Sequence, residues 1–140
     1  MINREFKINQ VTCIRVSKSL ARKAFQFNLK VYICPVNLRP GFPWSPEWEM
    51  NRIGTTFDET VSSFEAFNCI NAETGYYTAF YMEKWNALYF SFTDGSHHIF
   101  KSSRPETRIK VLETWSKNNS ITIDCERDGF VFCTLRKKER

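Results

Sequence analysis

The two histidines of the chain, His97 and His98, are adjacent in the sequence. Imidazole titrates near neutral pH, so these side chains suit general acid–base catalysis or metal binding. Neighbouring side chains on a β-strand point to opposite faces, so at most one of the two enters any given site. A nucleophilic pair would also need a thiol, which Cys125 or Cys133 would supply from the last predicted hairpin. One hypothesis is therefore a small hydrolase or nuclease-like enzyme using His97 or His98, and the alternative is a pair of exposed strand residues.

The five cysteines are an odd number and are widely spaced, at Cys13, Cys34, Cys69, Cys125 and Cys133. None forms a CxxC pair or a zinc-type cluster with histidine. P-loop, GxGxxG, GxSxG, HExxH and EF-hand motifs are also absent from the sequence. We therefore expect no metal, no cofactor, and reduced, mostly buried thiols in a cytoplasmic protein. A disulfide between Cys125 and Cys133, across the predicted hairpin, is the alternative.

Basic side chains gather at the two ends of the chain. The net charge of +5 divides into +6 for residues 1–30, +3 for residues 136–140 and −4 for the remainder. Cations grouped on one surface attract phosphate groups, whereas scattered ones form an ordinary solvated surface. If the two basic ends meet in the fold, phosphate binding is favoured; if they lie on opposite sides, an ordinary solvated surface is favoured. The basic residues predicted to bind a nucleic acid or partner are Arg15, Lys18, Arg22, Lys23, Arg136, Lys137 and Lys138.

Three tyrosines are the next candidates for binding. With a two-residue period, Tyr77 and Tyr81 share one face of the strand predicted over residues 76–84, and Tyr89 lies on the next predicted strand. These rings would line the second face of the sheet and stack on the bases of a single-stranded nucleic acid. The alternative is that a helix or loop covers this face. The Lys/Arg-Gly-Phe motif of sheet-based RNA binders is absent.

A loop rich in proline and tryptophan is predicted over residues 37–51. Its prolines favour extended backbone, on which Trp44 and Trp48 are four residues apart. Tryptophan is common at the centre of protein interfaces, so these two side chains are candidate anchors for a partner. The alternative is that they cover the core.

The composition indicates a folded domain that positions these groups. The chain has 140 residues, including 13 Phe, 5 Tyr and 4 Trp, and such large apolar side chains offset the entropy of ordering. A domain of this length buries about two thirds of its unfolded surface and needs no metal or disulfide to fold. No repeat or linker divides residues 1–140, so we predict a single domain with a short basic C-terminal tail. No secretory signal or membrane-spanning run is recognisable, so we expect no membrane contact.

The predicted class is α+β, with about three helices packed on a largely antiparallel sheet. Helices are expected from the Ser17 cap to about residue 27, from the Thr56–Glu59 capping box to about residue 68, and over residues 103–116. Strands are expected at residues 5–16 with a turn at Asn9–Gln10, and at 29–36, 76–84, 87–93, 97–102, 120–125 and 129–135. The strands at 76–84 and 87–93 are expected to pair with each other. Asp94–Gly95 and Arg127–Gly129 predict two further hairpins.

Four sequence motifs between Ser17 and Tyr81 carry a family resemblance. They are K-V-Y-I-C-P at Lys30–Pro35, R-P-x-x-P-W at Arg39–Trp44, F-D-x-x-V-x-x-F-x-x-x-N-C at Phe57–Cys69, and E-T-G-Y-Y-T-A-F-Y at Glu73–Tyr81. With them, this part of the chain resembles short uncharacterised proteins from phages and mobile elements of Firmicutes. The resemblance covers just under half of the chain and carries no activity with it. The resemblance implies that the chain originates from a phage or mobile element. Small proteins of such elements often bind host machinery, and anti-CRISPR-type inhibitors of defence nucleases are examples.

The leading hypothesis is a small non-catalytic protein that docks on a nucleic acid or a nucleoprotein complex of the host. The basic ends, the aromatic residues and the lack of a catalytic motif favour it. A further alternative is a homodimer, in which the partner is a second copy of the chain.

Overall fold

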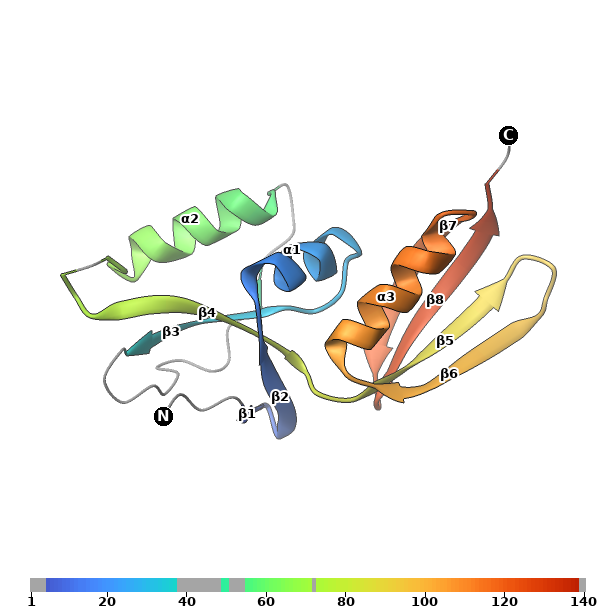
Figure 1. Ribbon diagram of the computed structural model, residues 1–140, viewed down its shortest axis with the longest axis horizontal. Helices are drawn as coiled ribbons and strands as arrows, with labels where there is room; N and C mark the ends of the chain where they lie inside the picture. The colour runs from blue at the N-terminus through green and yellow to red at the C-terminus, as the bar shows by residue number, and fades with distance from the viewer. Residues whose placement is uncertain (1–4, 38–48, 51–54, 72, 139–140) are drawn as a thin grey trace.

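The computed structural model describes residues 5–37, 49–50, 55–71 and 73–138, which hold three helices and eight strands (Figure 1). The helices are α1 (Lys18–Gln26), α2 (Phe57–Phe67) and α3 (Pro105–Ser116). The strands are β1 (Glu5–Ile8), β2 (Val11–Val16), β3 (Tyr32–Asn37), β4 (Tyr76–Glu83), β5 (Asn86–Phe92), β6 (His97–Ser103), β7 (Asn119–Arg127) and β8 (Phe130–Lys137). The α+β class is confirmed. The molecule is richer in sheet than predicted, because the strands form two four-stranded sheets instead of one.

Sheet A has the strand order β1-β2-β4-β3 and is antiparallel throughout. The predicted turn at Asn9–Gln10 is confirmed, and both residues have positive φ, as a two-residue hairpin of type I′ requires. Pro35 lies within β3 opposite Thr78. Proline has no N–H to donate, and it is tolerated here because β3 is an edge strand.

Sheet B has the order β6-β5-β8-β7. Its outer pairs are antiparallel hairpins, closed at Asp94–Gly95 and Asp128–Gly129 as the sequence predicts. Its central pair, β5 and β8, is parallel. A parallel pair needs a long crossover, and the chain between these strands supplies it through β6, α3 and β7.

The predicted pairing of residues 76–84 with 87–93 is wrong. Strand β4 pairs with β2 and β3 in sheet A, whereas β5 pairs with β6 and β8 in sheet B. Only Lys84 and Trp85 separate the two strands, and neither residue favours the positive φ of a two-residue hairpin. Both edges of β4 are already occupied, so the chain passes directly from one sheet into the other.

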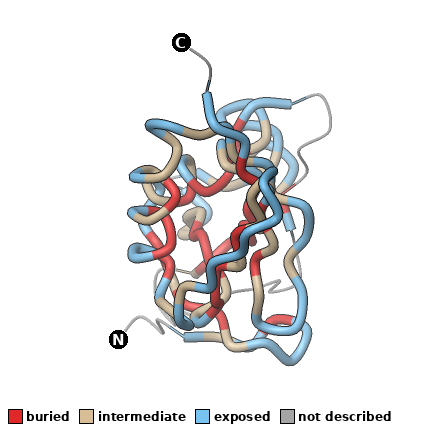
Figure 2. The backbone as a smooth tube through the Cα atoms, turned by 90° about the vertical axis from the view of Figure 1, so that its right-hand side faces the viewer, coloured by how far each residue is buried: buried red, intermediate tan, exposed pale blue. Residues whose placement is uncertain are grey.

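One apolar cluster joins the inner faces of both sheets to all three helices. Helix α1 contributes Ala21, Ala24 and Phe25, α2 contributes Phe57 and Val61, and α3 contributes Ile109 and Leu112. Figure 2 shows the buried stretches gathered in the middle of the molecule, with exposed stretches around them. The buried face of α2 does not extend to its last residue, because Phe67 is 82% exposed.

The two predicted helix caps are confirmed. Ser17 Oγ accepts a hydrogen bond from the N–H of Leu20 at 3.1 Å, which starts α1. At α2, Thr56 Oγ1 accepts from the N–H of Glu59 at 3.2 Å, and the Glu59 carboxylate accepts from the N–H of Thr56 at 3.4 Å. This reciprocal capping box satisfies two main-chain donors of the first turn.

Candidate functional site

The two faces of sheet B differ in what covers them. Alternation along β5 directs Leu88 and Phe90 inward, where both are fully buried against the core that includes α3. Tyr89 points to the opposite, outer face, and the register places it between Ile99 on β6 and Phe132 on β8. No helix among the described residues packs on this outer face. Within the described ranges, sheet B therefore has one face covered by the core and one face open.

The open face carries a row of rings. The Tyr89 and Phe132 ring centroids are 5.6 Å apart, and those of Phe130 and Phe132 are 5.7 Å apart. These three side chains are partly exposed, and Ile99 beside Tyr89 is 56% exposed. His97 continues the row, with its ring centroid 5.5 Å from that of Tyr89. We refer to the surface of Tyr89, His97, Ile99, Phe130 and Phe132 as the aromatic face.

Cations border the aromatic face. The guanidinium of Arg127 lies over the Phe132 ring, with its carbon 5.5 Å from the centroid. Arg136 lies four residues after Phe132 on the same face of β8 and is exposed. An acid on β7, Asp124, accepts a hydrogen bond at its carboxylate from Thr134 Oγ1 at 2.6 Å.

Tyr77 and Tyr81 do not join Tyr89 on one surface. They lie on sheet A, and Tyr81 is fully buried in a second apolar cluster that also holds Cys13, Cys34 and Val36. Burial raises the pKa of Tyr81 to about 12. Because its ring has no access to solvent, it is not available to stack on a base. Of the predicted tyrosine platform, Tyr89 alone lies on an open sheet face.

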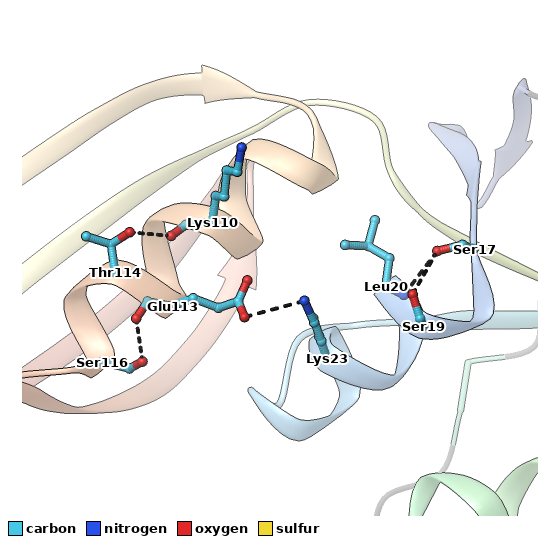
Figure 3. A network of polar contacts seen from close by, with 8 residues as sticks. All are labelled: Ser17, Ser19, Leu20, Lys23, Lys110, Glu113, Thr114 and Ser116. Carbon is cyan, nitrogen blue, oxygen red and sulfur yellow. Dashed lines mark hydrogen bonds and ion pairs between the residues drawn. The ribbon is translucent and has the colours of Figure 1, made fainter.

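The predicted cations of β2 and α1 split into two groups. Arg22 forms an ion pair with Asp58 at 2.7 Å, and Lys23 forms one with Glu113 of α3 at 3.5 Å (Figure 3). Arg15 and Lys18 form no ion pair within the described part of the chain, and both line a pocket above sheet A.

The basic tail approaches the same helix that Lys23 contacts. Lys138 donates its main-chain N–H to the oxygen of Asn118 at 2.9 Å, immediately after α3, while Lys23 reaches Glu113 near the end of that helix. Arg136, Lys137 and Lys138 are exposed. The two basic ends therefore flank the C-terminal part of α3, but Glu113 offsets the charge of Lys23 there.

His97 and His98 lie on opposite faces of β6, as the alternation predicts. His97 Nδ1 is 3.4 Å from Ser91 Oγ on the outer face, and the His98 ring packs on Phe100 with centroids 4.4 Å apart. Cys133 points inward and is buried, whereas Cys125 is exposed and lies opposite Phe132. The two thiols thus face opposite sides of the sheet, and all five described cysteines are free.

A buried polar cluster was missed by the sequence analysis. Arg108 of α3 is 1% exposed and donates to the main-chain oxygens of Ser103 and Glu83. Asn86, also 1% exposed, donates from Nδ2 to the Glu83 carboxylate at 2.7 Å. Glu126 accepts from the main-chain N–H of Lys30, and burial raises its pKa to about 7. These contacts join the end of sheet A to sheet B.

A beta-bulge directs Glu126 into this cluster. In β7 the residues before the bulge alternate normally, with Ile123 opposite the buried Cys133. The register then shifts, so that Glu126 lies opposite the buried Val131 and points inward. Bulges commonly redirect side chains in this way.

Two further findings concern the described residues as a whole. Among the described residues, no group of three or more His, Cys, Asp or Glu side chains is placed to hold a metal ion. None of the helices in the described ranges is long and apolar enough to cross a membrane. Trp44 and Trp48 lie outside the described residues.

Comparison of the chain with protein-family models, curated proteins and solved structures finds no match. The resemblance to phage and mobile-element proteins stays a prediction.

Proposed function

We propose that this protein binds single-stranded nucleic acid on the aromatic face of sheet B and does not catalyse a reaction. The observation that carries the proposal is the pair formed by Tyr89 and Phe132, two partly exposed rings 5.6 Å apart on the parallel central strands. Every base has a π-face, so rings held in this way stack on bases with little regard to sequence. The proposal narrows the expected ligand from a nucleic acid or nucleoprotein complex to a single strand.

The cations at this face favour a polynucleotide over an apolar protein partner. A purely apolar partner would gain nothing from the Arg127 guanidinium above Phe132 or from Arg136 farther along β8. A nucleic acid uses both kinds of group, because its bases stack on rings while its phosphates attract arginine. The net charge of +5 acts in the same direction by attracting a polyanion to the molecule.

The shape of the face favours a single strand over a duplex. Phe130 and Phe132 are two residues apart on one strand, with ring centroids 5.7 Å apart, so each of two splayed bases can meet a separate ring. The bases of a duplex are stacked on one another and do not present their faces to a sheet. A flat sheet face would therefore contact only the backbone of a duplex.

The alternative enzymatic function has weaker support from the geometry. The polar contact of His97 is a 3.4 Å approach to Ser91 Oγ, and both residues lie on the open face. A general base needs a third group that orients it and a site that excludes water. In the described structure His97 contacts the Tyr89 ring instead, which makes it an edge of the stacking surface.

The test is a fluorescence anisotropy titration of labelled DNA and RNA oligonucleotides, single-stranded and duplex, over a salt series. We expect the single strands to bind more tightly than the duplexes and to weaken as salt rises above about 50 mM. Phe67→Ala, which removes an exposed ring at the end of α2, away from sheet B, should bind single strands as the wild type does. An absence of binding to all single strands at low salt, where phosphate contacts are strongest, would refute the proposal.

A further inference from the structure

One feature that this function leaves unused is a pocket beside sheet A. Its volume is about 430 Å³, within the range of small-molecule sites. Its lining comes from the end of β2, the first turn of α1, the middle of α2 and the first half of β4. Arg15 and Tyr77 reach it from the face of sheet A opposite to Thr78 and Glu65. The polar residues that line it are Arg15, Ser17, Lys18, Glu65, Tyr77 and Thr78.

Two cations line the pocket and outnumber its one carboxylate, that of Glu65. Arg22 and Lys23, the other cations of this segment, are held in ion pairs outside the pocket. Arg15 and Lys18 form no ion pair with any described carboxylate, and both line the pocket. Two cations without an ion pair among the described residues offer charge-assisted donors to a phosphate dianion.

Arg15 is held in place by its neighbour on β4. Its Nη1 donates to the Tyr77 hydroxyl at 2.8 Å, and its guanidinium carbon lies 4.9 Å from the centroid of that ring. A guanidinium has five N–H donors, so most of them remain for a ligand. The side chain is also half-buried, and a fixed donor loses less entropy when it binds an anion.

The part of the pocket formed by α2 offers an acceptor. The Glu65 carboxylate of α2 accepts a hydrogen bond from Thr78 Oγ1 at 2.7 Å and keeps further acceptor capacity. A ligand that fits both parts of the pocket has an anionic group at one end and hydroxyl or amino donors at the other. We infer that this pocket binds a phosphate monoester of a nucleoside, with its phosphate at Arg15 and Lys18 and its donors toward Glu65.

Isothermal titration calorimetry with AMP, adenosine and inorganic phosphate tests this inference. We expect AMP to bind at least about tenfold more tightly than adenosine, and its affinity to rise through pH 6, about where a phosphate monoester gains its second charge. Adenosine binding as tightly as AMP would overturn the inference. Inorganic phosphate binding as tightly as AMP would overturn the role assigned to Glu65.

Substitutions locate the binding in the pocket. Lys18→Gln should weaken AMP binding about tenfold, whereas the matched variant Lys23→Gln, on the same helix but outside the pocket, should bind as the wild type does. Arg15→Gln should weaken it further, and Tyr77→Phe, which removes only the hydrogen bond to Arg15, should cost less. Lys18 is exposed, so the Lys18 variant decides the test if the Arg15 variant does not fold. Wild-type affinity in Lys18→Gln would overturn the inference.

Two sources would supply the same phosphate chemistry, namely a free nucleotide and the 5′-phosphate end of a strand. If a 5′-phosphorylated oligonucleotide competes with AMP and its 5′-hydroxyl counterpart does not, the ligand of the pocket is the end of a strand. If neither oligonucleotide competes with AMP, the ligand is a free nucleotide. The double variant Tyr89→Leu, Phe132→Leu should retain AMP binding, because both residues lie outside the pocket. AMP binding by this variant therefore tests the pocket independently of whether the aromatic face binds a single strand.

Discussion

Arg108 donates a hydrogen bond from Nη2 to the main-chain oxygen of Glu83 at 2.6 Å, and so ties α3 to the last residue of β4. The same guanidinium donates to Ser103 at the end of β6. One buried side chain therefore connects sheet A with sheet B at the point where the chain passes between them. Burial lowers the pKa of Arg108 to about 10, so the group stays charged at neutral pH.

Arg108→Ala should destabilise the fold by about 3 kcal/mol, because it leaves two buried carbonyl oxygens and the nearby Glu83 and Glu126 without their cation. Arg108→Lys keeps the charge but cannot bridge both oxygens, so we expect an intermediate loss. Urea denaturation measures both. An unfolding midpoint of Arg108→Ala equal to that of the wild type would contradict the role of Arg108 as a connection between the sheets.

Glu126 should make stability depend on pH. Its pKa is raised from 4.5 to about 7 in the folded protein, so the folded state binds the proton more tightly than the unfolded chain does. Its contribution is therefore complete below about pH 4.5 and is lost as pH rises to about 7, by at most about 3 kcal/mol. Glu126→Gln should flatten this part of the stability profile. A profile unchanged by the substitution would show that Glu126 titrates normally.

Replacement of rings by an aliphatic side chain separates stacking from general apolar contact. Tyr89→Leu and Phe132→Leu keep apolar bulk but remove the π-face, so each should weaken single-strand binding about tenfold. Urea denaturation of each variant controls for stability. If binding survives both substitutions unchanged, the rings do not stack on bases.

The arginines of the aromatic face should set the salt dependence. Each phosphate contact contributes about −0.7 to the slope of log affinity against log salt for a single strand. Arg127→Gln and Arg136→Gln together should therefore make the slope less negative by about 1.4. Arg22→Gln is the control, since Arg22 is paired with Asp58 away from sheet B. If the double variant has the same slope as the wild type, these arginines do not contact phosphates.

Thiol reactivity tests the burial of the cysteines. Cys69 and Cys125 are exposed and should react with a thiol reagent in the folded protein. Cys13, Cys34 and Cys133 are buried, and burial raises the pKa of each to about 12, so they should react only after unfolding. Prompt reaction of Cys133 would contradict the inward direction assigned to it.

Local sequence signals predicted most of the elements, because each signal acts within a few residues. The Ser17 and Thr56 caps start their helices, and the glycines at Gly95 and Gly129 close their hairpins with positive φ. The predicted pairing of β4 with β5 failed because it depends on long-range contacts. Adjacency in the sequence suggested a hairpin, but β2 and β3 occupy both edges of β4.

The candidate site was predicted only in part, for a similar reason. Tyr89 was identified by alternation, and the same two-residue period in the last hairpin would have identified Phe130 and Phe132 as its neighbours. Tyr81 was misplaced, because the sequence does not show that this face of sheet A is buried. Arg108 interrupts the apolar stripe of α3, which is a signal of a buried cation, whereas nothing local signals the bulge that turns Glu126 inward.

The most direct test of single-strand binding is a titration of isotope-labelled protein with oligo(dT) or oligo(rU), followed by NMR of the aromatic and amide groups. Stacked bases shift nearby resonances by their ring currents. We predict the largest shifts at Tyr89, Phe130 and Phe132, with little change at Ile109 and Leu112 on the covered side of sheet B. Unchanged Tyr89 and Phe132 resonances, or shifts confined to another surface, would contradict the proposed interface.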